Sequence, residues 1–352
     1  MRMRRMLSGG EGYYHVISRI TGQQFLMNAE EKDVLMRSMF NVAIFSGVEI
    51  LTFALMDNHF HLLVKVPRAH EVDEAELLKK MRVLYGDTKT DRILHDWDTW
   101  DKRGLSFKVE AAKEALRRRM FDLSQFCKTL KETYSMSYNY RHTHVGTIWG
   151  SRFKSVLLSP DYRTLMTVGS YIDLNPVRAG AVEEASAYRW NGYGTALRGN
   201  TLSRNGLCTM VAMAYLKRKV AYDTALTAYE SAMQGFIETP AKEEPAATSV
   251  RPSLRKKTEK PKEAQTFVSK QVARELAEGG KLSLFAMLRC KVRYFSQGLA
   301  VGPAAFVREV IGKLTPTKDT ASRCDCCDEI ELFTARRLRG DGKVSVPKGR
   351  VA

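Results

Sequence analysis

The sequence contains no long apolar run, no cysteine framework and fewer acidic than basic residues. The most apolar stretch, from Phe40 to Met56, is interrupted by polar residues, and no run reaches the roughly 18 apolar residues that indicate a membrane-spanning helix. No apolar signal region follows the basic segment Met1 to Arg5, so the six cysteines in 352 residues do not predict a disulfide framework. We therefore expect a cytoplasmic protein that does not bind a membrane.

Three of the cysteines, Cys324, Cys326 and Cys327, lie close together. A zinc site usually needs a second pair of cysteines or histidines at similar spacing, and none lies nearby. The cluster is therefore only a weak indication of a metal site.

Basic residues are what the chain has in excess, with 56 Lys and Arg against 39 Asp and Glu and a net charge of +17. Such a charge favours polyanionic partners, with nucleic acid first and an anionic membrane surface second. Apolar residues make up 44% of the sequence, which is enough for a core and excludes a wholly disordered chain.

Composition divides the chain at residues 239–264, where four prolines lie among small and charged residues. This pattern predicts a flexible linker between an N-terminal domain, residues 1–238, and a basic C-terminal domain, residues 265–352. Apolar residues at helical spacing predict two short helices in the C-terminal domain, and Gly302-Pro303 would open the second. We expect this domain to be an accessory, DNA-binding unit, with a solvated basic tail as the alternative.

The N-terminal domain begins with the pattern of a ferredoxin-like (RRM-like) α+β fold, an antiparallel sheet with packed helices. Residues 13–19 predict a strand, and residues 29–45 predict a helix that Asn28 caps. Two apolar runs, residues 48–56 and 59–66, are joined by Asp-Asn and predict an antiparallel hairpin. Strand, helix and hairpin in this order open a ferredoxin-like sheet.

The remaining pattern of this domain predicts four further segments. They are an insertion at 68–108, a long helix from 111 to about 134, a strand at 146–158, and a helix that begins at Ser159-Pro160-Asp161 and ends at Asn175.

A His-Phe-His sequence lies on the second strand of the hairpin. Side chains alternate across a strand, so His59 and His61 share one face while Phe60 shares the other with Leu62 and Val64. Two adjacent imidazoles suit a divalent metal, although two exposed histidines on a half-solvated strand would give the same pattern.

The last predicted helix places Tyr171 and Asn175 four residues apart, on one face beside its apolar stripe. The tyrosine hydroxyl could be a nucleophile and the asparagine oxygen could reach a metal. The alternative is a tyrosine at the edge of the core and an asparagine that caps the helix before Pro176.

Four motifs in this order resemble those of the single-strand DNA transposases with a His-hydrophobic-His motif. Within that family they are similar to the REP-associated tyrosine transposases, which act on repetitive extragenic palindromes. The resemblance covers roughly residues 10–200. It rests on Tyr14 to Arg19, Met56 to Val64, Trp149 to Lys154 and Ser170 to Gly180.

The resemblance implies an enzyme that cleaves and rejoins single-stranded or hairpin DNA through a 5′-phosphotyrosine intermediate. Tyr171 matches the nucleophile, while His59 and His61 match the ligands of a Mg²⁺ or Mn²⁺ ion. Asn175 matches the residue that completes the metal site, where relatives outside this branch often have glutamine. Relatives work as monomers or dimers, so a homodimer is one of the two oligomeric states that we expect.

The basic residues near these motifs are expected to bind DNA. The set comprises Arg19, Arg152, Lys154 and Arg178, and a basic and aromatic stretch at 138–144 is a further candidate. Two other functions use the same fold: a palindrome-binding regulator that does not cleave, and an RNA-binding protein with aromatic residues on its central strands. The His-x-His pair together with Tyr171 favours the enzyme, since a binding protein has no need of them.

Overall fold

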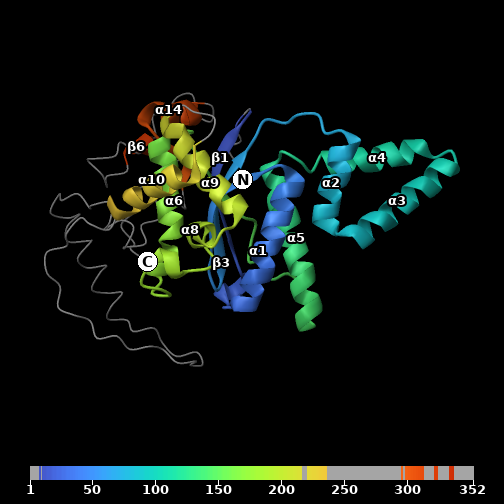
Figure 1. Ribbon diagram of the computed structural model, residues 1–352, viewed down its shortest axis with the longest axis horizontal. Helices are drawn as coiled ribbons and strands as arrows, with labels where there is room; N and C mark the ends of the chain where they lie inside the picture. Colours follow the sequence, from blue (N-terminus) through green and yellow to red (C-terminus); the bar gives the residue numbers. More distant parts are fainter. Residues whose placement is uncertain are drawn as a thin grey trace, which may run out of the picture.

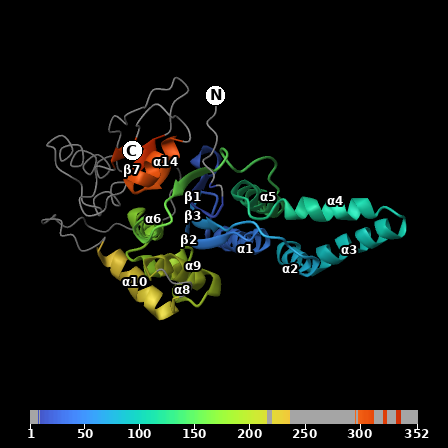
Figure 2. The same ribbon diagram turned by 90° about the horizontal axis from the view of Figure 1, so that it is seen from above.

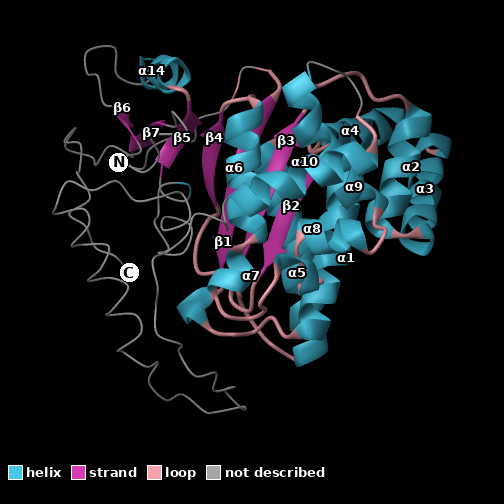
Figure 3. Cartoon of the chain, turned by 60° about the vertical axis from the view of Figure 1, so that its left-hand side comes forward, coloured by secondary structure: helices cyan, strands magenta, loops and turns pink. Residues whose placement is uncertain are grey.

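The computed structural model describes residues 8, 10–215, 220–235, 295, 298–312, 321–323 and 333–336. Its centre is a seven-stranded sheet in the order β2-β3-β1-β4-β5-β7-β6 (Figure 3). The strands are β1 (Gly12–Arg19), β2 (Glu49–Leu55), β3 (His59–Val66), β4 (Lys154–Leu158), β5 (Gly298–Gly302), β6 (Ala321–Arg323) and β7 (Phe333–Arg336). The first four strands are antiparallel and confirm the predicted ferredoxin-like α+β fold.

Helices pack on both faces of this sheet (Figure 1). Helices α1 and α5 cover one face, and α6, α9 and α10 cover the other. The helices are α1 (Ala29–Ser46), α2 (Glu74–Tyr85), α3 (Asp87–Lys102), α4 (Ser106–Arg117), α5 (Leu123–His142), α6 (Tyr162–Asp173), α7 (Asn175–Arg178), α8 (Gly192–Leu197), α9 (Thr201–Ala212), α10 (Tyr222–Gly235) and α14 (Ala304–Gly312). Short 3-10 turns lie at Thr21–Gln23, Ala185–Ala187 and Met213–Tyr215. In the described part of the chain, no helix combines the length and apolarity needed to cross a bilayer.

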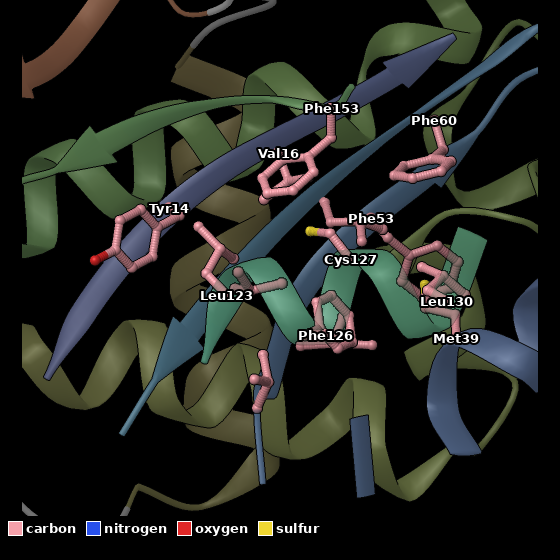
Figure 4. Close-up of a cluster of buried hydrophobic side chains, with 14 of the residues drawn as sticks. Tyr14, Val16, Met39, Phe53, Phe60, Leu123, Phe126, Cys127, Leu130 and Phe153 are labelled. Atoms are coloured by element: carbon pink, nitrogen blue, oxygen red, sulfur yellow. The ribbon is translucent and has the colours of Figure 1, made fainter. Parts of the chain in front are cut away.

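The alternation of side chains along β1 and β3 builds the first of these layers. Val16 and Phe60 point toward α5, where Phe126 and Leu130 complete the buried cluster (Figure 4). Burial of such side chains contributes about 1.5–3 kcal/mol each, so this layer holds the two strands rigidly in place. The other face of the same strands is left for the histidines and for α6.

The predicted helix and hairpin at the start of the domain are confirmed. Asn28 Oδ1 accepts a hydrogen bond of 2.9 Å from the Glu31 amide, and α1 ends at Gly47. Gly47 has φ of 71°, and a Cβ at this position would meet the ring of Phe121, so both conformation and space require glycine.

The long helix predicted from residue 111 to about 134 is wrong, because the chain turns between α4 and α5. Phe121 has φ of 53° there, and its amide donates to Ser46 O over 2.7 Å. Asp122 then caps α5 by accepting from the Gln125 amide. The apolar spacing continues across the turn, so periodicity alone did not reveal it.

Two other segments differ in extent from the prediction. The insertion predicted at 68–108 consists of α2, α3 and α4, reaches residue 117, and projects from the sheet (Figure 2). The strand predicted at 146–158 begins only at Lys154, because Trp149 makes an isolated bridge to Ile20 instead. The last predicted helix begins at Tyr162, with Asp161 as its cap, and ends at Asp173; Asn175 begins the separate helix α7.

The described residues beyond the predicted linker extend the same sheet. Strand β5 pairs with β4 in parallel, and β7 and β6 follow. Leu299 and Val301 are buried in the two layers of the N-terminal domain. This placement differs from the separate domain predicted at 265–352. The pairing of β5 with β4 joins segments far apart in the sequence, and such pairing leaves no local pattern from which it could be predicted. Gly302-Pro303 does precede α14 as predicted.

Several predicted features lie outside the described residues. They are the linker at 239–264, the first C-terminal helix and the Cys324, Cys326 and Cys327 cluster.

Candidate active site

The predicted histidine pair lies on the face of β3 that α6 covers. The rings of His59 and His61 have their centroids 5.0 Å apart. Phe60 faces the opposite layer, as the alternation predicted. His61 is only 3% exposed, whereas His59 is half-buried at the end of the strand.

A third histidine, His15 on β1, stacks on His61 with ring centroids 5.1 Å apart. Its Nε2 lies 2.9 Å from His61 Nδ1, and its Nδ1 lies 2.6 Å from the main-chain oxygen of Phe295. His15 lies within the motif Tyr14 to Arg19, but no role was predicted for it. The alternation of side chains along the first strand could show which face His15 lies on. It could not show that His15 meets His61, because the register between β1 and β3 is not a local property.

Burial dominates the electrostatics of these two rings. It lowers the pKa of His15 to about 4, and the positive charge of Arg178 acts in the same direction. Burial also holds the pKa of His61 well below its usual value. The charges of His59 and His15 lower this pKa further, to a smaller extent. Both rings are therefore neutral at pH 7, which is the form that can bind a metal.

Tyr171 approaches this group from α6. Its ring centroid lies 6.1 Å from that of His61 and 5.9 Å from that of His15, both edge-to-face. Phe295 packs against the tyrosine from the C-terminal part of the chain, with centroids 5.1 Å apart. Tyr171 is 6% exposed, so the structure brings the predicted nucleophile and histidine together in a largely covered site.

Asn175 and Arg178, the first and last residues of α7, both contact Tyr171. Asn175 Nδ2 donates to the main-chain oxygens of Tyr171 and Ile172, and its Oδ1 accepts from Arg178 over 2.5 Å. Arg178, predicted to bind DNA, lies within the site, with its guanidinium over the Tyr171 ring.

The other predicted DNA-binding residues lie on or next to strands β1 and β4. Arg19 ends β1 directly opposite His59 and is exposed. Lys154 stands in the same row of the sheet as His61, separated by Ile17, so it lies on the same face. Arg152 is exposed just before β4.

The basic and aromatic stretch at 138–144 lies partly elsewhere. Arg141 and His142 bind the buried carboxylate of Glu31 and join α5 to α1. Their main role in the described structure is therefore within the fold.

Asp173 anchors the helix that carries Tyr171 and was not predicted as a key residue. Its carboxylate is fully buried and accepts hydrogen bonds from Thr52 on β2, Tyr229 on α10 and the Tyr193 amide of α8. Burial raises the pKa of this carboxyl to about 6, although the hydrogen bonds that the carboxylate accepts act to lower it.

The types of donor atom at His59, His61 and Asn175 are ones that divalent cations bind. His59 Nδ1 lies 2.7 Å from Asn58 Oδ1 and His61 Nδ1 lies beside His15, so hydrogen-bond partners occupy the Nδ1 side of both rings. Imidazole nitrogens with an amide oxygen form a mixed set suited to such a cation. The oxygen of Asn175 has two lone pairs, only one of which Arg178 needs. No cluster of three His, Cys, Asp or Glu side chains suited to a metal occurs among the described residues.

The region of the chain that contains the histidine pair is similar to known proteins. Residues 10–93 match the family model of IS200-like transposases. No curated protein matches the chain. A solved structure of a REP-associated tyrosine transposase bound to a REP hairpin is similar at 14% identity and a TM-score of 0.37, over 56% of this chain and 87% of that chain. The region with His59 and His61 is therefore similar to the IS200-like transposases.

Proposed function

We propose that this protein is a transposase that cleaves and rejoins single-stranded or hairpin DNA, with Tyr171 as the nucleophile. One observation carries the proposal: the Tyr171 ring lies 6.1 Å from that of His61. Tyr171 lies beyond residues 10–93, so its approach to the histidine is independent of the family match.

The reaction follows from the groups at this site. The Tyr171 hydroxyl loses its proton and attacks phosphorus, which forms a new P–O bond and breaks the bond to the 3′-oxygen. The departing oxygen takes up a proton, which leaves a 3′-OH and a 5′-phosphotyrosine. A Mg²⁺ or Mn²⁺ ion, when held by His59, His61 and Asn175, supplies positive charge that polarises the scissile phosphate.

The protein's own residues supply positioning for this step. Arg178 holds Asn175 Oδ1 and covers the Tyr171 ring, so it keeps the predicted nucleophile and the predicted third ligand in register. The phosphotyrosine retains the energy of the original ester, so another 3′-OH can reverse the attack and rejoin strands without ATP.

The DNA partner follows from charge and from the family. Arg19 and Lys154 lie on or beside the face of the histidines, where they can contact phosphates. The REP-hairpin complex of the similar solved structure makes a hairpin the first substrate to test. A palindrome-binding regulator that does not cleave is the second candidate, and the covered position of Tyr171 favours it.

The decisive experiment is incubation with labelled single-stranded hairpin DNA from the regions flanking the gene, with Mn²⁺ or Mg²⁺. We expect a denaturant-stable protein–DNA adduct that Tyr171→Phe abolishes, because only the hydroxyl is removed. Tyr162→Phe, on the first residue of the same helix, is the matched control and should keep the adduct. Adduct lost in the control and retained in Tyr171→Phe would move the nucleophile to Tyr162. Tight binding without any adduct would indicate the regulator.

A further inference from the structure

Three groups in the interior of the site form a continuous line of hydrogen bonds. The main-chain oxygen of Phe295 lies 2.6 Å from His15 Nδ1, and His15 Nε2 lies 2.9 Å from His61 Nδ1. The line begins in the segment before β5, crosses β1 and ends on β3. It therefore connects three parts of the chain that are distant in sequence.

The chemistry of the first group sets the direction of the whole line. A carbonyl oxygen can only accept, so His15 Nδ1 carries a proton and donates it. The buried, neutral His15 ring then has a lone pair on Nε2, which can only accept. His61 must donate from Nδ1, and this leaves the lone pair of His61 on Nε2.

We propose that His15 is a positioning residue that fixes the tautomer of His61, with the Phe295 carbonyl as the fixed end of the relay. The inference rests on the proposed function in one respect, since it assigns His61 Nε2 as the atom that binds the metal. Hydrogen bonding of the second ring nitrogen is the usual way in which proteins orient a ligating histidine.

His59 has a corresponding but shorter support. Its Nδ1 lies 2.7 Å from the side-chain oxygen of Asn58, the preceding residue in the turn. A carboxamide oxygen also accepts, so His59 too carries its proton on Nδ1. Both histidines thus present Nε2, one through a local contact and the other through a relay across the sheet.

The relay also assigns a role to the C-terminal part of the chain. Phe295 is buried in the same cluster as Tyr171, and β5 holds the following residues against β4. A main-chain carbonyl is a suitable fixed end because its position does not depend on a side-chain rotamer. The C-terminal segment therefore acts on the tautomer of the metal ligand through His15.

The tautomer is measurable without metal or DNA. Long-range ¹H–¹⁵N correlation spectra of the metal-free full chain, assigned with single His→Gln variants, report which nitrogen of each of the seven histidines is protonated. We expect Nδ1–H for both His15 and His61, whereas imidazole in water carries its proton mainly on Nε2. A His61 ring protonated on Nε2 would overturn the proposal.

Two substitutions at His15 separate the relay from simple packing. In His15→Gln the side-chain oxygen can reach the place of Nε2 and accept from His61. In His15→Asn the shorter amide reaches only the place of Nδ1, beside the Phe295 carbonyl. We expect the Kd for Mn²⁺, measured by EPR, to stay within about threefold of wild type for Gln and to rise about 10–100-fold for Asn.

Thermal unfolding of both variants provides the control for packing. Equal Mn²⁺ affinity for Gln and Asn at equal stability would contradict the proposal. If a variant is unstable, the ¹H–¹⁵N spectrum of the wild type decides, because it reports the tautomer of His61 directly. If wild type shows the Nδ1–H tautomer but binds no Mn²⁺, the relay is supported and the metal site of the proposed function is wrong.

Discussion

Arg178 lies over the ring of Tyr171, with its guanidinium carbon 4.1 Å from the ring centroid, and donates to Asn175 Oδ1 over 2.5 Å. One side chain thus joins the predicted nucleophile to the predicted third metal ligand. Only the fork of an arginine can make both contacts at once, since a lysine offers a single ammonium group. The residue was expected to bind DNA, and its position in the structure indicates a role within the site.

Arg178→Lys should separate these two roles. The variant keeps the charge but loses the planar fork, and a charge-assisted hydrogen bond contributes about 1.5–3 kcal/mol. We expect formation of the phosphotyrosine adduct to slow at least about tenfold, while the Kd for hairpin DNA changes less than about threefold. Arg92→Lys, at an exposed position of α3, is the control and should leave the adduct rate unchanged. A parallel loss of DNA affinity in Arg178→Lys would restore the DNA-binding role.

Removal of the histidine pair should abolish metal-dependent cleavage. We expect no adduct from the double variant His59→Ala, His61→Ala, and none from wild type in EDTA, because the imidazole donors or the metal are then missing. Cleavage is measured with labelled hairpin DNA, and folding with thermal unfolding, since His61 is buried. The exposed His95 on α3 is the control, and His95→Ala should behave as wild type. Full activity in EDTA would contradict the metal site.

The buried carboxyl of Asp173 should make stability depend on pH. Burial raises its pKa to about 6 from an ordinary value of 3.8. Because the folded state then binds the proton more tightly than the unfolded state, the free energy of unfolding should fall as the pH rises from about 4 to about 6. At about 1.36 kcal/mol per pKa unit, the change is roughly 3 kcal/mol.

Asp173→Asn isolates this effect, because asparagine does not titrate. We expect the difference in unfolding free energy between wild type and variant to change by roughly 3 kcal/mol over that range, when measured by urea unfolding at several pH values. Other titrating groups contribute equally to both proteins and cancel. Parallel pH profiles would show that Asp173 has an ordinary pKa in the folded protein.

Truncation should show whether the C-terminal residues belong to the catalytic fold. A chain of residues 1–235 lacks β5 and Phe295, and so loses the buried Leu299 and Val301. Each such side chain contributes about 1.5–3 kcal/mol, so we expect Tm to fall by about 10 °C or more. Residues 1–336, which retain β5 to β7, are the control and should keep most of the stability. An unchanged Tm for residues 1–235 would support the separable domain that the sequence predicted.

The sequence predicted the parts of the site that depend on local patterns. Strand alternation placed His59 and His61 on one face and Phe60 on the other, and the structure agrees. The cap at Asn28 and the hairpin turn before His59 were also predicted, because hydrogen bonds within a few residues determine them. The motifs carried the transposase resemblance, and the family match over residues 10–93 includes the first two of them.

The tertiary structure decided which distant residues meet. The pairing of β1 with β3 sets His15 beside His61, and the parallel pairing of β5 with β4 brings Phe295 to the site. The turn at Phe121, which divides the predicted long helix, depends on contacts with Ser46 and Gly47. Helical and strand periodicities record only which face of an element is buried. The register and partner of each face depend on packing between segments far apart in the chain, and such packing leaves no local signal.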